Sequence, residues 1–198
     1  MTGGMTLGDA LGPIRSSRAA TDIVITTMGA SREWMAMGPL HPLDFVLVPS
    51  SMGQATSLGL GLALARPDRR VIVVNGDGSM LMNLGSLVTI AAERPANLTV
   101  IVGDNGAYEV TGGQPTPAAK AGTDFVAIAR GAGFERVFRY ADAARWAADL
   151  PPVLTGGPTF VVLDVETVPG GIGPRSPGPA GERARRFMAA LATPGSTG

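Results

Sequence analysis

The chain has 198 residues, of which 45% are hydrophobic and 16% charged, and its 16 basic residues balance its 16 acidic ones. This size suits one globular domain with short extensions. The balanced charge disfavours nucleic acid as a partner, and the absence of cysteine excludes disulfides, thiolate metal sites and a cysteine nucleophile.

The sequence also lacks the features of a membrane or secreted protein. Its longest apolar stretch, from Leu58 to Ala65, is eight residues long, whereas a membrane-spanning helix needs ~20. The first residues, MTGGMTLGDALG, have neither the basic region nor the apolar core of a signal peptide. We therefore expect a cytoplasmic protein without membrane contact.

In chain order, β-rich runs alternate with Ala-rich amphipathic runs. Residues 1–20 are expected to form one helix with a break at Pro13. Strands are predicted at 22–27, 44–48, 71–75, 98–102, 135–140 and 159–165. Helices are predicted at 32–37, 53–65, 79–93, 124–131 and 142–149. This alternation predicts a three-layer, doubly wound parallel α/β sheet.

Two strands are expected at the centre of this sheet, because the runs 71–75 and 98–102 show no alternation of polar residues. We divide the chain into an N-terminal extension (1–20), a main domain (21–168) and a C-terminal tail (169–198). The tail is rich in Pro and Gly, ends in a short helix, and is expected to pack on a partner or to fray.

The strand at 71–75 runs directly into Gly76-Asp77-Gly78-Ser79, and a helix follows. Small residues at a strand-to-helix turn bring backbone amides and a helix N-terminus to an anion. A bare Asp77 carboxylate would repel a phosphate, unless it holds a divalent cation that bridges to the phosphate oxygens. The turn therefore predicts a metal together with a diphosphate.

A second oxygen donor follows the next strand, where Asn105 offers a neutral amide oxygen. The carboxyl ends of parallel strands emerge at one edge of the sheet, so Asp77 and Asn105 can meet there. Taken alone, however, the turn could simply begin a helix that Ser79 caps.

Other features allow plainer interpretations. Met52 alone could be core packing, and Gly59 with Gly61 indicates close backbone packing of a helix. The run GLGLAL does not complete a dinucleotide-binding pattern, because Leu64 stands where a third Gly is needed. His41, the only histidine, is interpreted as structural. Within the run YEVTGGQ, residues 109, 111 and 114 could face a substrate or belong to a surface loop without chemistry.

The GDGS run, followed by Asn105 and Tyr108, resembles the signature of thiamine diphosphate enzymes. By this resemblance, Mg²⁺ would be bound by the side chains of Asp77 and Asn105 and by the backbone carbonyl of Ala107. Gly78 and Ser79 would contact the diphosphate. The family usually has two Asn in succession where this chain has Asp104 and Asn105, which puts the role of Asp104 in doubt.

The resemblance continues upstream in Ser50-Ser51-Met52-Gly53. In the family, a bulky apolar residue at the Met52 position wedges between the two rings of the cofactor. Gly29-Ala30-Ser31 resembles the segment that lies against the aminopyrimidine. Altogether, the residues implied in cofactor binding are Gly29, Ala30, Ser31, Ser50, Ser51, Met52, Gly76, Asp77, Gly78, Ser79, Asn105, Ala107 and Tyr108. Met52 and Glu109 are the candidates for a direct part in catalysis.

Within the family, the chain resembles the phosphonopyruvate and sulfopyruvate decarboxylases through four ordered blocks. These are ASRE, SMGQATSLGLGLALARPDRRV, MNLGSLVTIA and DNGAYEVTGGQPT. The resemblance implies a 2-oxo acid decarboxylase with thiamine diphosphate and Mg²⁺ as cofactors. An acyloin-forming carboligase subunit and a non-catalytic cofactor-binding subunit remain as alternatives.

Family members also have a pyrimidine-binding domain, which supplies a Glu to the aminopyrimidine. A chain of 198 residues has no room for a second domain of ~150 residues. The resemblance therefore implies a β subunit whose catalytic Glu lies on a separate α subunit, in a hetero-oligomer of α2β2 or larger composition. The expected substrate is a small 2-oxo acid.

Overall fold

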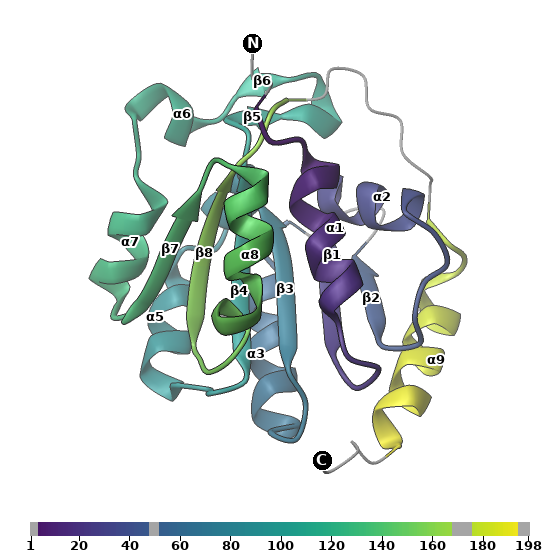
Figure 1. The fold of residues 1–198 in the computed structure, drawn as a ribbon. Coiled ribbons are helices and arrows are strands. Elements are labelled where there is room, and N and C mark those ends of the chain that lie inside the picture. The colour runs from purple at the N-terminus through teal and green to yellow at the C-terminus, as the bar shows by residue number, and fades with distance from the viewer. Residues whose placement is uncertain (1–3, 48–51, 168–175, 194–198) are drawn as a thin grey trace.

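The structure is a computed structural model that describes residues 4–47, 52–167 and 176–193. Within them lies a six-stranded sheet with the order β2-β1-β3-β4-β8-β7, in which every neighbouring pair is parallel (Figure 1). Its strands are β1 (Ile23–Thr27), β2 (Asp44–Leu47), β3 (Val71–Gly76), β4 (Leu98–Asp104), β7 (Arg136–Tyr140) and β8 (Thr159–Asp164). The central positions predicted for 71–75 and 98–102 are confirmed.

Helices cover both faces of the sheet and complete the three predicted layers. One face carries α1 (Leu7–Ser17), α2 (Met28–Ala36) and α8 (Ala143–Val153), and the other carries α3 (Ala55–Ala65), α5 (Gly85–Glu93), α7 (Phe125–Ala132) and α9 (Ala180–Ala192). Successive strand residues point to opposite faces. Thus Ile23 and Ile25 pack in the core under α3, while Val24 packs in the core under α1 and α2.

The chain reverses direction across the sheet at β1. From β1 it passes through α2 to β2 on one side, and then through α3 to β3 on the other side of β1. In doubly wound sheets the carboxyl ends of strands at such a reversal diverge, which leaves a crevice for ligands. The carboxyl ends of β1, β3 and β4 therefore mark the expected binding edge.

The predicted helix at 79–93 is wrong as a single element. The structure has α4 (Asp77–Leu81) and α5 instead, with turns at residues 82–84. In this break, Asn83 Nδ2 donates to the backbone carbonyl of Gly53 at 2.9 Å and lies 3.2 Å from Ser57 Oγ. Bonds to another segment thus replace continuation of the helix, a competition for which asparagine is well suited.

The segment after β4 is more ordered than the sequence predicts. A two-stranded hairpin of β5 (Ala107–Tyr108) and β6 (Gln114–Pro115) encloses the short 3-10 helix η1 (Glu109–Thr111), and α6 (Pro117–Ala121) follows. Figure 1 shows this hairpin above the carboxyl ends of the sheet. Strands of two residues give no periodic signal, so they escaped prediction.

The expected break at Pro13 is also wrong, because α1 continues through that residue. Ala10, Leu11 and Ile14 are fully buried on both sides of the proline, and Trp146 Nε1 of α8 donates to the carbonyl of Ala10 at 2.8 Å. Tertiary packing therefore outweighs the local cost of the proline.

Helix α9 is formed and packs on its own chain, so the expectation that the tail helix frays is wrong for residues 180–192, whereas its packing on a partner stays a prediction. The ring centroids of Phe187 and Phe45 lie 4.8 Å apart. In addition, Arg183 Nη1 donates to the carbonyl of Val46 at 2.6 Å. The helix thereby covers the β2 edge of the sheet, which would otherwise offer unpaired backbone groups. The division of the chain at residues 20 and 168 stays a prediction.

Gly59 and Gly61, two residues apart in α3, provide a matched test of packing. A Cβ on Gly59 would lie 2.3 Å from Val73 Cγ2, whereas a Cβ on Gly61 would meet no heavy atom within 4 Å. We expect Gly59→Ala to lower the free energy of unfolding by ~2–3 kcal/mol through overpacking. Gly61→Ala should raise it by ~0.5–1 kcal/mol through helix propensity. Urea denaturation of both variants measures these free energies of unfolding. Equal changes in the two variants would contradict the close contact between Gly59 and Val73.

Candidate functional site

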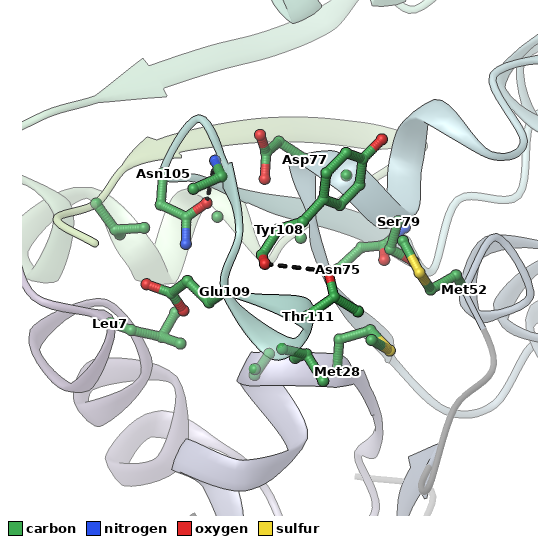
Figure 2. A pocket seen from close by; sticks show the side chains of 18 of the residues that line it. Leu7, Met28, Met52, Asn75, Asp77, Ser79, Asn105, Tyr108, Glu109 and Thr111 are labelled. Atoms are coloured by element: carbon green, nitrogen blue, oxygen red, sulfur yellow. Dashed lines mark hydrogen bonds between the residues drawn. The ribbon is translucent and has the colours of Figure 1, made fainter. Parts of the chain in front are cut away.

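A cavity of about 370 Å³ opens at the carboxyl ends of β1, β3 and β4. It gathers most of the predicted site residues from four separate segments of the chain (Figure 2). Those that line it are Gly29, Ala30, Met52, Gly76, Asp77, Gly78, Ser79, Asn105, Ala107, Tyr108 and Glu109. The sequence thus predicted a set of residues that the fold brings together, although their roles toward a cofactor stay predictions.

Asp77 is the first residue of α4 and is only 2% exposed. Burial raises the pKa of its carboxyl group to about 6, although hydrogen bonds from the Gly78 backbone and the Thr116 hydroxyl act in the opposite direction. Thr116 Oγ1 donates to Asp77 Oδ2 at 3.1 Å. A buried carboxylate of this kind is costly unless a cation or hydrogen bonds offset its charge.

Asn105 lies at the turn between β4 and β5. Its Oδ1 accepts a hydrogen bond from the backbone amide of Ala107 at 3.0 Å. An amide oxygen has two lone pairs, so this bond orients the side chain and leaves capacity for a second partner. The oxygens of Asp77 and Asn105, with the backbone carbonyl of Ala107, belong to the hard-donor class that Mg²⁺ prefers.

The hairpin meets the GDGS turn through an aromatic ring. A Cβ on Gly78 would lie 2.4 Å from Cε1 of Tyr108, so only glycine lets the ring approach this closely. Tyr108 lines the cavity and is the N-cap residue of η1, and its carbonyl accepts a hydrogen bond from Thr111 Oγ1 at 3.3 Å (Figure 2). The close approach joins the segments that carry Asp77 and Asn105.

Ser79 does not cap the helix, because Gly76 is the N-cap and Ser79 lies inside α4. Its Oγ instead accepts a hydrogen bond from the backbone amide of Gly53 at 3.0 Å. This bond attaches the turn that contains Met52 to the GDGS segment. The interpretation of Ser79 as the N-cap of the helix is therefore wrong. Met52 lines the cavity beside this bond.

Ser31 is the described candidate that the structure does not place at the cavity. It is fully buried, and its Oγ lies 3.0 Å from Thr26 Oγ1 within the core. The helical rotation of α2 turns this side chain inward, whereas Gly29 and Ala30 line the cavity. Ser50 and Ser51 lie outside the described residues.

The two alternatives for the YEVTGGQ segment divide between its residues. Glu109 and Thr111 line the cavity, whereas Gln114 does not and instead donates through Nε2 to the carbonyl of Thr111 at 3.1 Å.

His41 agrees with its structural interpretation, because its Nδ1 accepts from the backbone amide of Leu43 at 3.1 Å and it does not line the cavity.

Sequence reasoning missed several cavity residues. Met28, at the start of α2, has a φ of 55°, which is rare for a residue with a Cβ. Leu7 and Val165 come from distant parts of the chain. The remaining missed lining residues are Asn75, Met82, Gly103 and Val110. Thr116, which bonds Asp77 from 39 residues away, ends the block DNGAYEVTGGQPT, but the sequence assigned it no role.

The donor set restricts what ion the cavity could hold. Among the described residues, no group of three or more His, Cys, Asp or Glu side chains is arranged to hold a metal. A metal here would therefore use neutral oxygens beside at most two carboxylates, which suits a cation that also binds ligand oxygens. The arrangement fits the expected Mg²⁺ and diphosphate.

Comparison with protein families decides the affiliation. The model described as "Thiamine pyrophosphate enzyme, C-terminal TPP binding domain" matches residues 22–165. The chain belongs to the thiamine pyrophosphate enzymes. Thiamine pyrophosphate is another name for thiamine diphosphate, so the resemblance inferred from GDGS and Asn105 is confirmed.

Two curated relatives share about two fifths of their aligned residues with this thiamine diphosphate enzyme domain. Phosphonopyruvate decarboxylase from Streptomyces viridochromogenes is 41% identical over 181 residues, which make up 87% of this chain and 42% of that protein. Sulfopyruvate decarboxylase subunit beta from Methanothermobacter thermautotrophicus is 42% identical over 155 residues, or 73% of this chain and 80% of that protein. The chain thus spans less than half of one relative and most of the other.

A solved structure supports the fold. An enzyme from Mycobacterium smegmatis assigned to the thiamin diphosphate-dependent class superposes with a TM-score of 0.67 at 23% identity, covering 83% of this chain and 32% of that one. At this identity the similarity establishes the fold alone.

Within the described part of the chain, no helix is long and apolar enough to cross a membrane.

Proposed function

We propose that the chain is the β subunit of a thiamine diphosphate-dependent 2-oxo acid decarboxylase, and that it binds Mg²⁺ and the cofactor diphosphate. The observation that carries this proposal is the buried carboxylate of Asp77, which shares the cavity with Asn105. Asp77 and Glu109 line the cavity, and no Lys, Arg or His is found among its described lining residues. A bound divalent cation would offset the negative charge of Asp77 and attract the diphosphate.

In this proposal Asp77, Asn105 and the Ala107 carbonyl hold Mg²⁺, and the backbone at Gly78 and Ser79 faces the diphosphate. Thiamine diphosphate supplies the electron sink for the loss of CO2 from a 2-oxo acid. The chain would contribute binding and orientation. Glu109, at the rim formed by η1, is the candidate for contact with the substrate.

The decarboxylase assignment draws its support from the relatives. The two described above are named for phosphonopyruvate and sulfopyruvate, both small 2-oxo acids with a second acidic group. We therefore propose a substrate of this class. The choice between a substrate with a phosphonate group and one with a sulfonate group depends on the substrate pocket, to which a partner is expected to contribute.

A partner subunit is proposed on two grounds. The relative of which this chain spans 80% is named as a beta subunit. In addition, α3 contains no charged residue, and Leu64, Met82 and Val88 of the α3 to α5 region are at least half exposed. An uncharged helical surface with exposed aliphatic side chains is typical of a protein interface. We propose that an α subunit with a pyrimidine-binding domain covers it and supplies the catalytic Glu.

A decarboxylation assay tests the proposed function. The β chain, its α partner, Mg²⁺ and thiamine diphosphate should convert phosphonopyruvate or sulfopyruvate into CO2 and the corresponding aldehyde. Asp77→Ala in the β chain should abolish this turnover, which would exclude a non-catalytic subunit. Formation of a coupled hydroxyketone instead of the aldehyde would contradict the decarboxylase assignment.

Met52→Ala tests the proposed shaping of the cofactor. We expect turnover to fall by ~10- to 100-fold, because small errors in the position of a reacting group are costly in rate. Cofactor affinity should change by less than ~3-fold, because the diphosphate end should dominate binding. The measurements are kcat and calorimetric cofactor affinity, with Met188→Ala as the control, since Met188 is 67% exposed on α9. Unchanged turnover with weakened binding would contradict the role.

A further inference from the structure

Thr116 connects the two segments that carry the proposed metal ligands. It follows β6 and is the N-cap of α6, and it is fully buried. Its backbone amide donates to the carbonyl of Gly106 at 2.8 Å, next to Asn105. Its hydroxyl reaches Asp77 in α4. One residue therefore contacts both sides of the proposed site.

The direction of the hydroxyl bond follows from the other contacts. Thr116 Oγ1 accepts the backbone amide of Ala119 at 3.3 Å, as an N-cap oxygen does. A carboxylate can only accept, so the single hydroxyl proton points to Asp77 Oδ2 at 3.1 Å. Together with the hydrogen bond from the Gly78 backbone, this bond restricts the rotation of the carboxylate about its terminal torsion, which is otherwise broad and soft.

We infer that Thr116 is a positioning residue that holds the Asp77 carboxylate in register with the Asn105 turn for Mg²⁺. This inference rests on the proposed function. Asp77 and Asn105 follow different strands, β3 and β4. Among the residues that the structure describes, only Thr116 donates a side-chain hydrogen bond to Asp77. Mg²⁺ tolerates little deviation from octahedral geometry, so a fixed carboxylate favours its binding. Partners of this kind orient metal ligands and tune their affinity.

A merely structural role for Thr116 makes a different prediction. Loss of an N-cap bond costs ~1 kcal/mol of stability without a specific effect on metal affinity. Loss of a partner that orients a metal ligand costs ~10- to 100-fold in metal affinity. Metal affinity and thermal stability must therefore be measured on the same variants.

The experiment is a calorimetric titration of Mg²⁺ into the 198-residue chain with saturating thiamine diphosphate. Thr116→Val removes the hydroxyl at nearly constant shape and should weaken Mg²⁺ binding by ~10-fold, whereas Thr116→Ser should stay within ~2-fold of the unmodified chain. Thr159→Val is the matched control, because Thr159 is fully buried, bonds the carbonyl of Gly156 at 3.0 Å and starts β8 at the opposite end of the sheet.

The outcomes separate the inference from the proposed function. If Asp77→Ala binds Mg²⁺ as tightly as the unmodified chain, the proposed metal site is wrong. If Asp77→Ala loses binding but Thr116→Val keeps it, only the positioning role is overturned. If Thr159→Val weakens binding as much as Thr116→Val, the effect reflects general destabilisation and the role is again overturned. Should Thr116→Val fail to fold, Thr116→Ala at low temperature takes its place, with circular dichroism as the check of folding.

Discussion

Replacing Asp77 with Asn is expected to abolish Mg²⁺-dependent cofactor binding while stabilising the metal-free protein. The first effect follows from the loss of the only carboxylate among the proposed metal ligands, and we expect at least ~100-fold weaker binding. The second follows from burial, because a 2% exposed carboxylate carries an unfavourable charge in the folded state. Function and stability therefore oppose each other at this residue.

The pH dependence of this stabilisation has a definite sign. The reference pKa of Asp is 3.8, whereas the pKa of folded Asp77 is about 6. Between these values the folded state binds more protons than the unfolded state, so stability falls as the pH rises through this window. Above pH ~6 the folded state bears the full free-energy cost of the ionised Asp77 carboxylate. Asp77→Asn should therefore give no gain near pH 4 and a gain of ~2–3 kcal/mol near pH 7.5.

The control is Asp104→Asn, because Asp104 precedes Asn105 but does not line the cavity. Its carboxylate lies 3.9 Å from Arg139 Nη2 and borders a second, polar cavity. Asp104 stands where the family usually has Asn, but it lies outside the cavity. Metal binding should therefore survive its replacement by Asn. The unmodified chain, Asp77→Asn and Asp104→Asn are compared in two measurements. Urea denaturation with a chelator at several pH values gives their stability, and Mg²⁺ titration gives their metal affinity. Retained binding in Asp77→Asn, or lost binding in Asp104→Asn, would contradict the assignment.

The isolated chain is expected to be almost inactive. By family resemblance, the Glu that interacts with the aminopyrimidine belongs to the pyrimidine-binding domain, which we propose lies on the α subunit. Loss of a proton-transfer group costs ~100- to 10,000-fold in rate, so the chain alone should show less than ~1% of the rate of the complex. The assay uses pyruvate, phosphonopyruvate and sulfopyruvate, each with saturating Mg²⁺ and thiamine diphosphate.

Two controls sharpen this result. The α subunit alone should also be inactive, and a complex with Asp77→Ala in the β chain should remain inactive, which assigns the requirement to both half-sites. The α subunit should also raise the melting temperature of the β chain, because we propose that it binds only the folded form and covers α3, which contains no charged residue. Robust turnover by the single chain would contradict the proposed division of the site.

The sequence predicted the sheet because its signals are local. The apolar runs of β3 and β4 identify strands covered on both faces, and their order along the chain places Asp77 and Asn105 at one edge. The family signature then added Met52 and the Gly29 segment, which line the same cavity. Residues close to a strand end were thus within reach of prediction.

The remaining features depend on tertiary packing that no local pattern contains. Asn83 interrupts a helical run because it bonds Gly53 from another segment. Ser31 follows two cavity residues, yet the rotation of α2 directs it to Thr26. The bond from Thr116 to Asp77 joins residues 39 positions apart, and the hairpin that makes it possible consists of strands too short to show periodicity.

Titration of thiamine diphosphate into the purified chain, with Mg²⁺ and then with excess EDTA, tests the central claim most directly. In the proposed site, Asp77, Asn105 and the Ala107 carbonyl would supply only some of the oxygens that Mg²⁺ needs, so diphosphate oxygens would add to them and the metal and cofactor would bind together. We expect calorimetry to show binding with Mg²⁺ and its loss on chelation. Equal cofactor affinity with and without EDTA would contradict the assignment of Asp77 as a metal bridge to the diphosphate.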